Sequence, residues 1–189
     1  QVRTITKEEC KFTYRDSIFK KEAKGKFVIT SITLKLSRSA PAVPDYPGVK
    51  KYFDDNGISR PTLQQIRQAI IDIRGVKLPD PKNIASVGSF FKNAFVSREQ
   101  YLALMKKFPN MVAYPMDDGT YKIGAGWLLE TLGLKGKQIG GLQFYPYNAL
   151  VLTNIGDAKF VELQQLIEQT KSDVYDKFGI NIELEPLIV

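Results

Sequence analysis

The residue types best suited to chemistry gather in residues 77–93, which read KLPDPKNIASVGSFFKN. Pro79 and Pro81 fix the backbone angle φ and remove two amide donors, which excludes a helix around them. Gly88 permits a sharp turn or a close approach of the backbone to another group. Ser89 follows, with a lysine and an asparagine close behind it, and this set of donors suits an anionic ligand that carries a carbonyl group. A serine after a glycine is also common in ordinary turns, so these residues alone leave both interpretations open.

The composition excludes several classes of site. The 189 residues include no histidine and a single cysteine, Cys10. A Ser-His-Asp or Cys-His site therefore cannot be built from this chain, and we expect no zinc site. An internal disulfide is impossible, which fits a reducing compartment. The sequence holds no apolar run of roughly 20 residues and no basic-then-apolar leader. Because it begins at Gln1 rather than at a methionine, we expect it to be part of a longer chain.

The net charge of +7 indicates an anionic partner, either nucleic acid, a membrane surface or a phosphorylated small molecule. The lysines are spread along the chain, which argues against a stripe that binds nucleic acid. One cluster of four lysines surrounds Gly25, where we expect a solvated hairpin turn.

The hydrophobic pattern predicts an α+β protein in two parts, with a break near Pro79. In the first part we expect a strand over 27–36, a proline-rich loop over 37–48, and a helix over 61–74 that ends at Gly75. In the second part we expect, in order, a helix over 97–108, a strand over 120–123, a short helix that ends at Gly133, a strand over 149–153, a helix over 157–178 that ends at Gly179, and a strand over 180–184.

Two of these helices carry apolar residues that we expect to face the core. In the helix over 97–108 the inward residues are expected to be Leu102, Met105 and Phe108. In the helix over 157–178 they are expected to be Phe160, Leu163, Ile167, Val174 and Phe178.

Five short motifs occur along the whole chain in a characteristic order. They are YRDSIFK at 14–20, KLPDP at 77–81, GSFFKN at 88–93, AGW at 125–127 and QIGG at 138–141. In order and spacing they resemble UDP-N-acetylenolpyruvoylglucosamine reductase, the MurB family of bacterial peptidoglycan synthesis. The resemblance covers only the C-terminal part of that enzyme. Its N-terminal part, with the glycine-rich loops that hold the FAD pyrophosphate, has no counterpart here, so the cofactor-binding residues remain unassigned.

The resemblance implies a domain organisation and a reaction. Residues 1–77 would be the end of an α+β FAD-binding domain, 78–180 a smaller α+β substrate-binding domain, and 181–189 a strand that returns toward the FAD-binding part. In the family, NADPH reduces FAD, and the flavin delivers a hydride to UDP-N-acetylglucosamine enolpyruvate to give UDP-N-acetylmuramate. The resemblance also implies a cytoplasmic monomer with no nucleic-acid or membrane partner.

The resemblance further implies roles for particular residues. Arg15, Ser89 and Glu185 would be catalytic, with Arg15 holding the substrate carboxylate and Ser89 donating the proton. A serine hydroxyl is a weak acid, so a neighbour such as Lys92 or a water molecule would have to polarise it. The remaining matched residues would bind the UDP-sugar; they are Tyr46, Lys77, Asn93 and Gln138.

The carboxyl-terminal motif departs from the family pattern. The family usually ends in Leu-Glu-Pro-Glu-Val, whereas this chain reads IELEPL over 182–187. A gapless count from the preceding helix places the catalytic glutamate at Glu185, an alignment on Glu-Pro places Leu187 there, and Glu183 is a further candidate. Two other functions also stay open: a fragment that binds UDP-sugars without activity, or a different flavin oxidoreductase of similar architecture.

Overall fold

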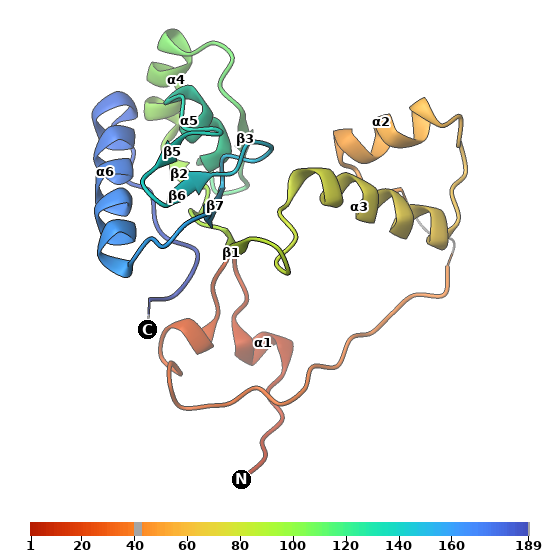
Figure 1. The fold of residues 1–189 in the computed structure, drawn as a ribbon. Coiled ribbons are helices and arrows are strands. Elements are labelled where there is room, and N and C mark those ends of the chain that lie inside the picture. The colour runs from red at the N-terminus through yellow and green to blue at the C-terminus, as the bar shows by residue number, and fades with distance from the viewer. Residues whose placement is uncertain (40–42, 189) are drawn as a thin grey trace. The chain divides into compact units, whose positions relative to one another are not determined.

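The computed structural model describes residues 1–39 and 43–188, and the chain forms two compact units, residues 1–40 and 41–189 (Figure 1). No helix in these described ranges has both the length and the apolar character needed to cross a membrane.

The first unit is built from short local elements. Helix α1, Lys7–Cys10, begins at Thr6, whose hydroxyl accepts from the Glu9 amide while the Glu9 carboxylate accepts from the Thr6 amide. The 3₁₀ helix η1, Ile18–Lys20, leads into a run of turns in which Gly25 has φ of +73°. The turn expected around Gly25 is confirmed, but it is not a hairpin, because no paired strands flank it in the described residues.

The strand expected over residues 27–36 is wrong. This segment has neither helix nor strand structure, and Val28 and Leu36 are 88% and 82% exposed. The segment has the residue types of a strand, but a strand forms only when a neighbour accepts and donates its backbone hydrogen bonds. Within the described part of the first unit no such neighbour is present.

The second unit opens with a pair of helices, α2, Pro47–Asp55, and α3, Leu63–Lys77. The expected proline-rich loop therefore ends early, because Pro47 occupies the first turn of α2, where a missing amide costs nothing. Helix α3 runs through Gly75, so the cap expected there is wrong. Its last residue is Lys77, and the capping residue Leu78 adopts an extended conformation before Pro79. The pair has its own apolar cluster, built on Val49, Phe53, Ile66 and Ala69.

The rest of the second unit is an α+β structure with two antiparallel sheets, which confirms the predicted class. The first sheet has the order β1-β7-β6-β5, with β1 Ala85–Ser89, β7 Val151–Asn154, β6 Leu142–Phe144 and β5 Gln138–Ile139. The second has the order β2-β4-β3, with β2 Ala94–Val96, β4 Tyr121–Ile123 and β3 Ala113–Pro115. Three helices complete it: α4 Arg98–Lys107, α5 Ala125–Thr131 and α6 Phe160–Phe178.

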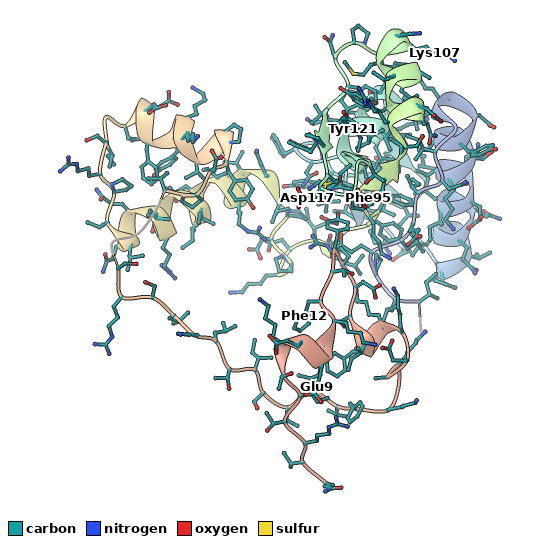
Figure 2. The ribbon with its side chains drawn as sticks, turned by 180° about the vertical axis from the view of Figure 1, so that it is seen from behind. Glu9, Phe12, Phe95, Lys107, Asp117 and Tyr121 are labelled. Atoms are coloured by element: carbon teal, nitrogen blue, oxygen red, sulfur yellow. The ribbon has the colours of Figure 1, made fainter. Side chains whose placement is uncertain are left out.

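One large apolar core joins these sheets and helices, and it is separate from the cluster between α2 and α3. Leu128, Leu129 and Phe144 are almost fully buried in it. Tyr121 on β4 stacks on Tyr101 of α4 with ring centroids 3.8 Å apart, which fixes the second sheet against that helix (Figure 2).

Two of the residues expected to face inward do not. Leu102 and Phe160 are about half exposed, and Leu104 is the buried residue of α4. Helix α6 begins at Phe160, three residues later than expected, which leaves Phe160 at its exposed first turn. Its expected end is confirmed, because Gly179 takes φ of +64° and its amide bonds to the Tyr175 carbonyl.

The expected strand over 180–184 is also wrong, since it is reduced to one isolated bridge between Leu184 and Phe91. This bridge nevertheless brings the carboxyl-terminal segment alongside the GSFFKN motif.

Candidate active site

Strand β1 carries a bulge that sets the position of Ser89. Ser86 pairs with Thr153 of β7, but the next pair joins Ser89 to Val151, so β1 holds one extra residue. Gly88 makes this possible with φ of +79°, and its amide donates to the Ser86 hydroxyl at 3.1 Å. In a regular ladder Gly88 would have faced Val151. The bulge therefore places the Ser89 hydroxyl opposite Val151, where a regular ladder would place a glycine without a side chain.

The bulge also leaves the Ser89 hydroxyl available. The side chain is half-buried, and it makes no hydrogen bond to another residue in the described part of the chain. Phe90 and Phe91, which follow it, are buried in the core and fix the backbone just beyond the serine.

The carboxyl-terminal segment brings a glutamate to the residue next to Ser89. The Glu185 amide donates to the Phe90 carbonyl at 3.0 Å. Two residues along, the Lys92 amide donates to the Glu183 carbonyl at 2.8 Å. Segments about 90 residues apart in sequence thus lie side by side, and Glu185 is the carboxylate residue aligned with Phe90.

Lys92 does not serve the serine in this arrangement. Its ammonium group lies 2.8 Å from a carboxylate oxygen of Glu183, and the two side chains are 28% and 75% exposed. Lys92 was expected to polarise Ser89, but in this structure it pairs with Glu183 of the neighbouring segment. The Glu183 carboxylate is therefore bound to a cation.

Asn93 has a structural contact inside the motif. Its side-chain oxygen accepts from the amide of Ala125, the first residue of α5, at 3.0 Å. The asparagine therefore links the end of the GSFFKN motif to the AGW motif.

The other residues expected to bind substrate lie on separate elements of the second unit. Tyr46 precedes α2 and is 68% exposed, and Lys77 is the exposed last residue of α3. Neither side chain forms a hydrogen bond or ion pair within the described ranges. The Gln138 amide group, on β5, donates to the Gly140 carbonyl at 3.0 Å.

Arg15 belongs to the first unit. Its backbone has φ of +54°, which is uncommon for a residue with a side chain, and the bridge between Thr13 and Asp16 encloses it in a tight turn. The guanidinium carbon lies 5.4 Å from the centre of the Tyr14 ring, and the Arg15 carbonyl accepts from the Lys20 ammonium. Arg15 is exposed.

Sequence reasoning missed an aromatic and cationic row across the second sheet. Phe95, Lys122 and Tyr114 face one another on β2, β4 and β3, and the Lys122 ammonium lies 5.3 Å from the centre of the Tyr114 ring. Figure 2 shows Phe95 on this sheet. The row could be found only after the strands were paired, because its members are far apart in sequence.

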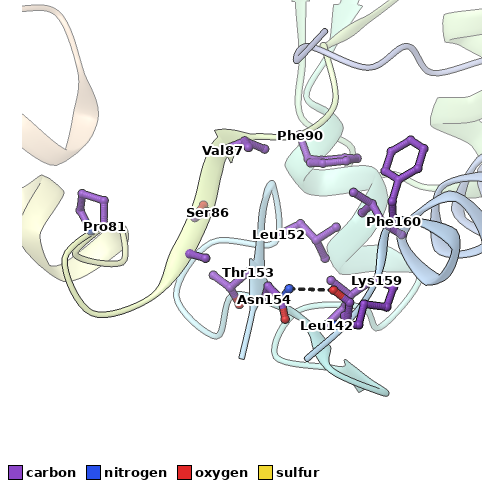
Figure 3. Close-up of a pocket in the computed structure, with 13 residues that line it drawn as sticks. Pro81, Ser86, Val87, Phe90, Leu142, Leu152, Thr153, Asn154, Lys159 and Phe160 are labelled. Atoms are coloured by element: carbon purple, nitrogen blue, oxygen red, sulfur yellow. Dashed lines mark hydrogen bonds between the residues drawn. The ribbon is translucent and has the colours of Figure 1, made fainter. Parts of the chain in front are cut away.

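The cavity in this unit, of about 370 Å³, lies elsewhere, between β1, β7 and the start of α6 (Figure 3). Its lining includes Ser86, Phe90 and Leu163, and the Asn154 amide closes part of it by donating to the Ala158 carbonyl at 3.1 Å. None of the seven expected site residues lines this cavity. With a mostly apolar lining and Lys159 as its charged residue, it does not suit a nucleotide diphosphate.

The described residues do not supply a cradle for a flavin dinucleotide. One common form of such a cradle is a glycine-rich turn that opens onto a helix N-terminus. The turn at Gly140 and Gly141 is filled instead, because a Cβ atom on Gly141 would lie 2.8 Å from the Ala158 amide nitrogen. Helix α5 begins beside glycines, but its first amide, that of Ala125, already donates a hydrogen bond to the Asn93 side-chain oxygen.

The fold and the site together define an antiparallel α+β domain that presents a serine and a glutamate on adjoining segments. Residues 80–189 match the family model described as UDP-N-acetylenolpyruvoylglucosamine reductase, C-terminal domain. The chain belongs to this family.

Curated relatives agree with this assignment. A protein of Chromobacterium violaceum is 39% identical over 189 residues, which cover 100% of this chain and 55% of the relative. One of Flavobacterium johnsoniae is 39% identical over 190 residues, covering 100% and 56%. One of Bordetella pertussis is 40% identical over 181 residues, covering 96% and 51%. All three are named UDP-N-acetylenolpyruvoylglucosamine reductase, and the chain spans about half the length of these relatives.

Proposed function

We propose that this chain is the substrate-binding and proton-delivering part of a reductase that converts UDP-N-acetylglucosamine enolpyruvate to UDP-N-acetylmuramate, with NADPH and FAD as cofactors. The observation that carries the proposal is the hydrogen bond from the Glu185 amide to the Phe90 carbonyl, which aligns a carboxylate residue with the neighbour of Ser89. Family membership supplies the choice of substrate.

Reduction of the enolpyruvyl double bond needs one hydride and one proton on adjacent carbons. When bound, the reduced flavin supplies the hydride. Ser89 supplies the proton from a hydroxyl that no other described side chain occupies. Arg15 holds the substrate carboxylate through two parallel N–H donors and so stabilises the charge that develops beside it. Glu185 orients the serine and the substrate.

The UDP-sugar would be held by cations, amides and aromatic rings. Lys77 binds the diphosphate, while Asn93 and Gln138 bind the sugar and Tyr46 covers it. We add Tyr114 and Lys122, because a ring next to an ammonium group suits a pyrimidine base joined to a phosphate.

The decisive experiment uses the full-length protein, purified and examined for bound flavin. We expect a yellow protein that oxidises NADPH only when the enolpyruvyl sugar is present and that forms the N-acetylmuramate product. Purified protein without flavin would rule out the reductase. NADPH oxidation that does not depend on the enolpyruvyl sugar would favour a different flavin oxidoreductase.

A second function is a nucleotide-sugar-binding fragment without activity. It is favoured by the turn at Gly141, where close packing against Ala158 leaves no room for a pyrophosphate. Calorimetric titration of the 189-residue chain with UDP-N-acetylglucosamine tests it. Binding with no flavin uptake and no turnover identifies the chain alone as such a module, while the full-length assay decides for the whole protein.

A further inference from the structure

We infer that Lys92 and Glu183 form a positioning pair that holds Glu185 against Phe90, the residue after Ser89. The inference deepens the proposed reductase function and rests on it. The two residues are 91 positions apart in sequence, and their side chains meet at 2.8 Å.

Few backbone contacts hold the carboxyl-terminal segment in place. In the described residues, its backbone contacts with the GSFFKN motif are the Lys92 amide on the Glu183 carbonyl, the Glu185 amide on the Phe90 carbonyl, and the bridge between Phe91 and Leu184, while Ile180 and Ile182 are buried in the core. The segment is not a strand of either sheet. A side-chain contact therefore has a large share in fixing its alignment.

The apolar pattern alone does not fix which residue lies beside Ser89. Ile182 and Leu184 alternate with Glu183 and Glu185, so a slip of two residues keeps every side chain on its own face. Such a slip would align Phe90 with Glu183 in one direction and with Leu187 in the other. The ion pair disfavours the first slip, because Lys92 would then face Asn181 instead of Glu183. In the second slip Lys92 would face Glu185, so there the pair favours the observed alignment only through the geometry of the present contact.

The pair also divides the roles of the two glutamates. The Glu183 carboxylate pairs with Lys92. Because the Lys92 side chain is only 28% exposed, solvent screens this ion pair less than it would screen a pair with a fully exposed lysine. Glu183 is therefore the positioning residue, and Glu185 keeps the catalytic role of the proposed function.

A charge exchange in the full-length, flavin-loaded enzyme tests this. The variants are Lys92→Glu, Glu183→Lys and the double exchange. The matched control is Lys171→Glu, which breaks the pair with Glu168 on the surface of α6. We expect each single reversal at the positioning pair to lower kcat about 5–10-fold, with the KM for the UDP-sugar and the rate of flavin reduction by NADPH unchanged. The double exchange restores kcat to within about twofold of the wild type, and the control has no effect.

A second readout does not depend on activity. Amide hydrogen exchange at Glu185 reports its bond to Phe90, and we expect it to accelerate about tenfold in each single reversal and to recover in the double exchange. The milder Glu183→Gln, which keeps the shape of the side chain, should accelerate it about threefold if a reversal variant fails to fold.

The outcomes separate the two hypotheses. A double exchange as slow as the single variants would mean that Lys92 or Glu183 acts on the substrate itself, which overturns the positioning role. The positioning role would also be overturned if the single variants kept the wild-type kcat and the wild-type rate of amide hydrogen exchange at Glu185. An unaltered enzyme that leaves the enolpyruvyl sugar unreduced would overturn the proposed function, while the exchange rates would still judge the pair.

Discussion

At the scale of single residues, the proposed chemistry depends on a serine hydroxyl that no described side chain polarises. The Ser89 hydroxyl has no hydrogen bond to another described residue, and the nearby cation of Lys92 belongs to Glu183. A hydroxyl is a poor acid until a neighbour or the bound substrate polarises it. The serine is therefore expected to become an effective donor only once the substrate is in place.

Replacing Ser89 by alanine should separate the two halves of the reaction. In the full-length protein we expect Ser89→Ala to lower product formation by about 10²–10⁴-fold, because the proton donor is lost. Reduction of the flavin by NADPH should keep its rate. Rapid-mixing absorbance of the flavin measures both steps, and Ser172→Ala, on the exposed face of α6, is the control. Equal loss of both steps would argue against a proton donor.

At the scale of elements, the bulge of β1 depends on one glycine. A Cβ atom on Gly88 would meet nothing within 4 Å, so the cost of a side chain there is conformational rather than steric. The φ of +79° disfavours any L-residue with a side chain.

We therefore expect Gly88→Ala to destabilise the protein by about 1–2 kcal/mol and to move Ser89. The matched variant is Gly75→Ala, inside α3 and also with open space, which should instead stabilise by about 0.5–1 kcal/mol. Urea unfolding of both variants measures the difference. Equal effects of the two would mean that the positive φ at Gly88 is not needed.

Helices α2 and α3 are joined by a hydrogen bond that depends on pH. The Tyr52 hydroxyl donates to the Asp72 carboxylate at 2.8 Å, and this bond is the main reason that the pKa of Tyr52 lies above 10.0, with desolvation second. A raised pKa means that folding favours the neutral phenol. This contribution to stability is complete below about pH 10 and is lost as the pH rises through the folded pKa.

A pH titration of tyrosine ultraviolet absorbance should reveal this group. We expect the Tyr52 phenol to ionise late because its pKa is raised, and Tyr52→Phe should remove that late step. Tyr147→Phe is the control, since that residue is exposed. A titration in which Tyr52→Phe removes only an ordinary step would refute the link.

The sequence predicted those elements whose boundaries are set locally. The helix start expected near residue 97 and the glycine after α6 are read from a few adjacent residues. Helix α4 begins at Arg98, where the Ser97 hydroxyl accepts from the Gln100 amide, and Gly179 ends α6. The two-residue strand β5 and the strand β3 were missed, because short strands exist only through their partners. The same reasoning explains the failed strand over 27–36.

The candidate site shows the same division. Ser89 and Glu185 were chosen through the family motifs, and nothing in their local sequence states that the segments meet. The pairing of Glu185 with Phe90, the use of Lys92 by Glu183 and the link from Asn93 to Ala125 are all contacts between distant segments. They follow from the tertiary structure and could not be read from spacing.

At the scale of the whole molecule, the two apolar clusters of the second unit share no residue. The larger one draws on residues from Phe90 onward, and the smaller lies between α2 and α3. The domain boundary expected near residue 78 stays a prediction. The separation of the two apolar clusters makes it possible to test this boundary.

We expect the fragment 79–189 to fold by itself, because it contains both sheets and the large core. Its two-dimensional amide spectrum should retain the dispersed signals of the same residues in the 189-residue chain, and its thermal unfolding should be cooperative. A collapsed spectrum would show that α2 and α3 are required for this core. A fragment ending at residue 178 is the control, since it lacks the buried Ile180 and Ile182 and should unfold more readily.

The unpaired segment over 27–36 has a consequence for handling the protein. It presents Val28, Ile32, Leu34 and Leu36 to solvent in a stretch rich in β-branched residues. Such a stretch is a template for edge-to-edge association with further copies of itself. The 189-residue chain alone should therefore tend to aggregate at high concentration, and a charged substitution such as Ile32→Lys should raise its solubility without touching the site.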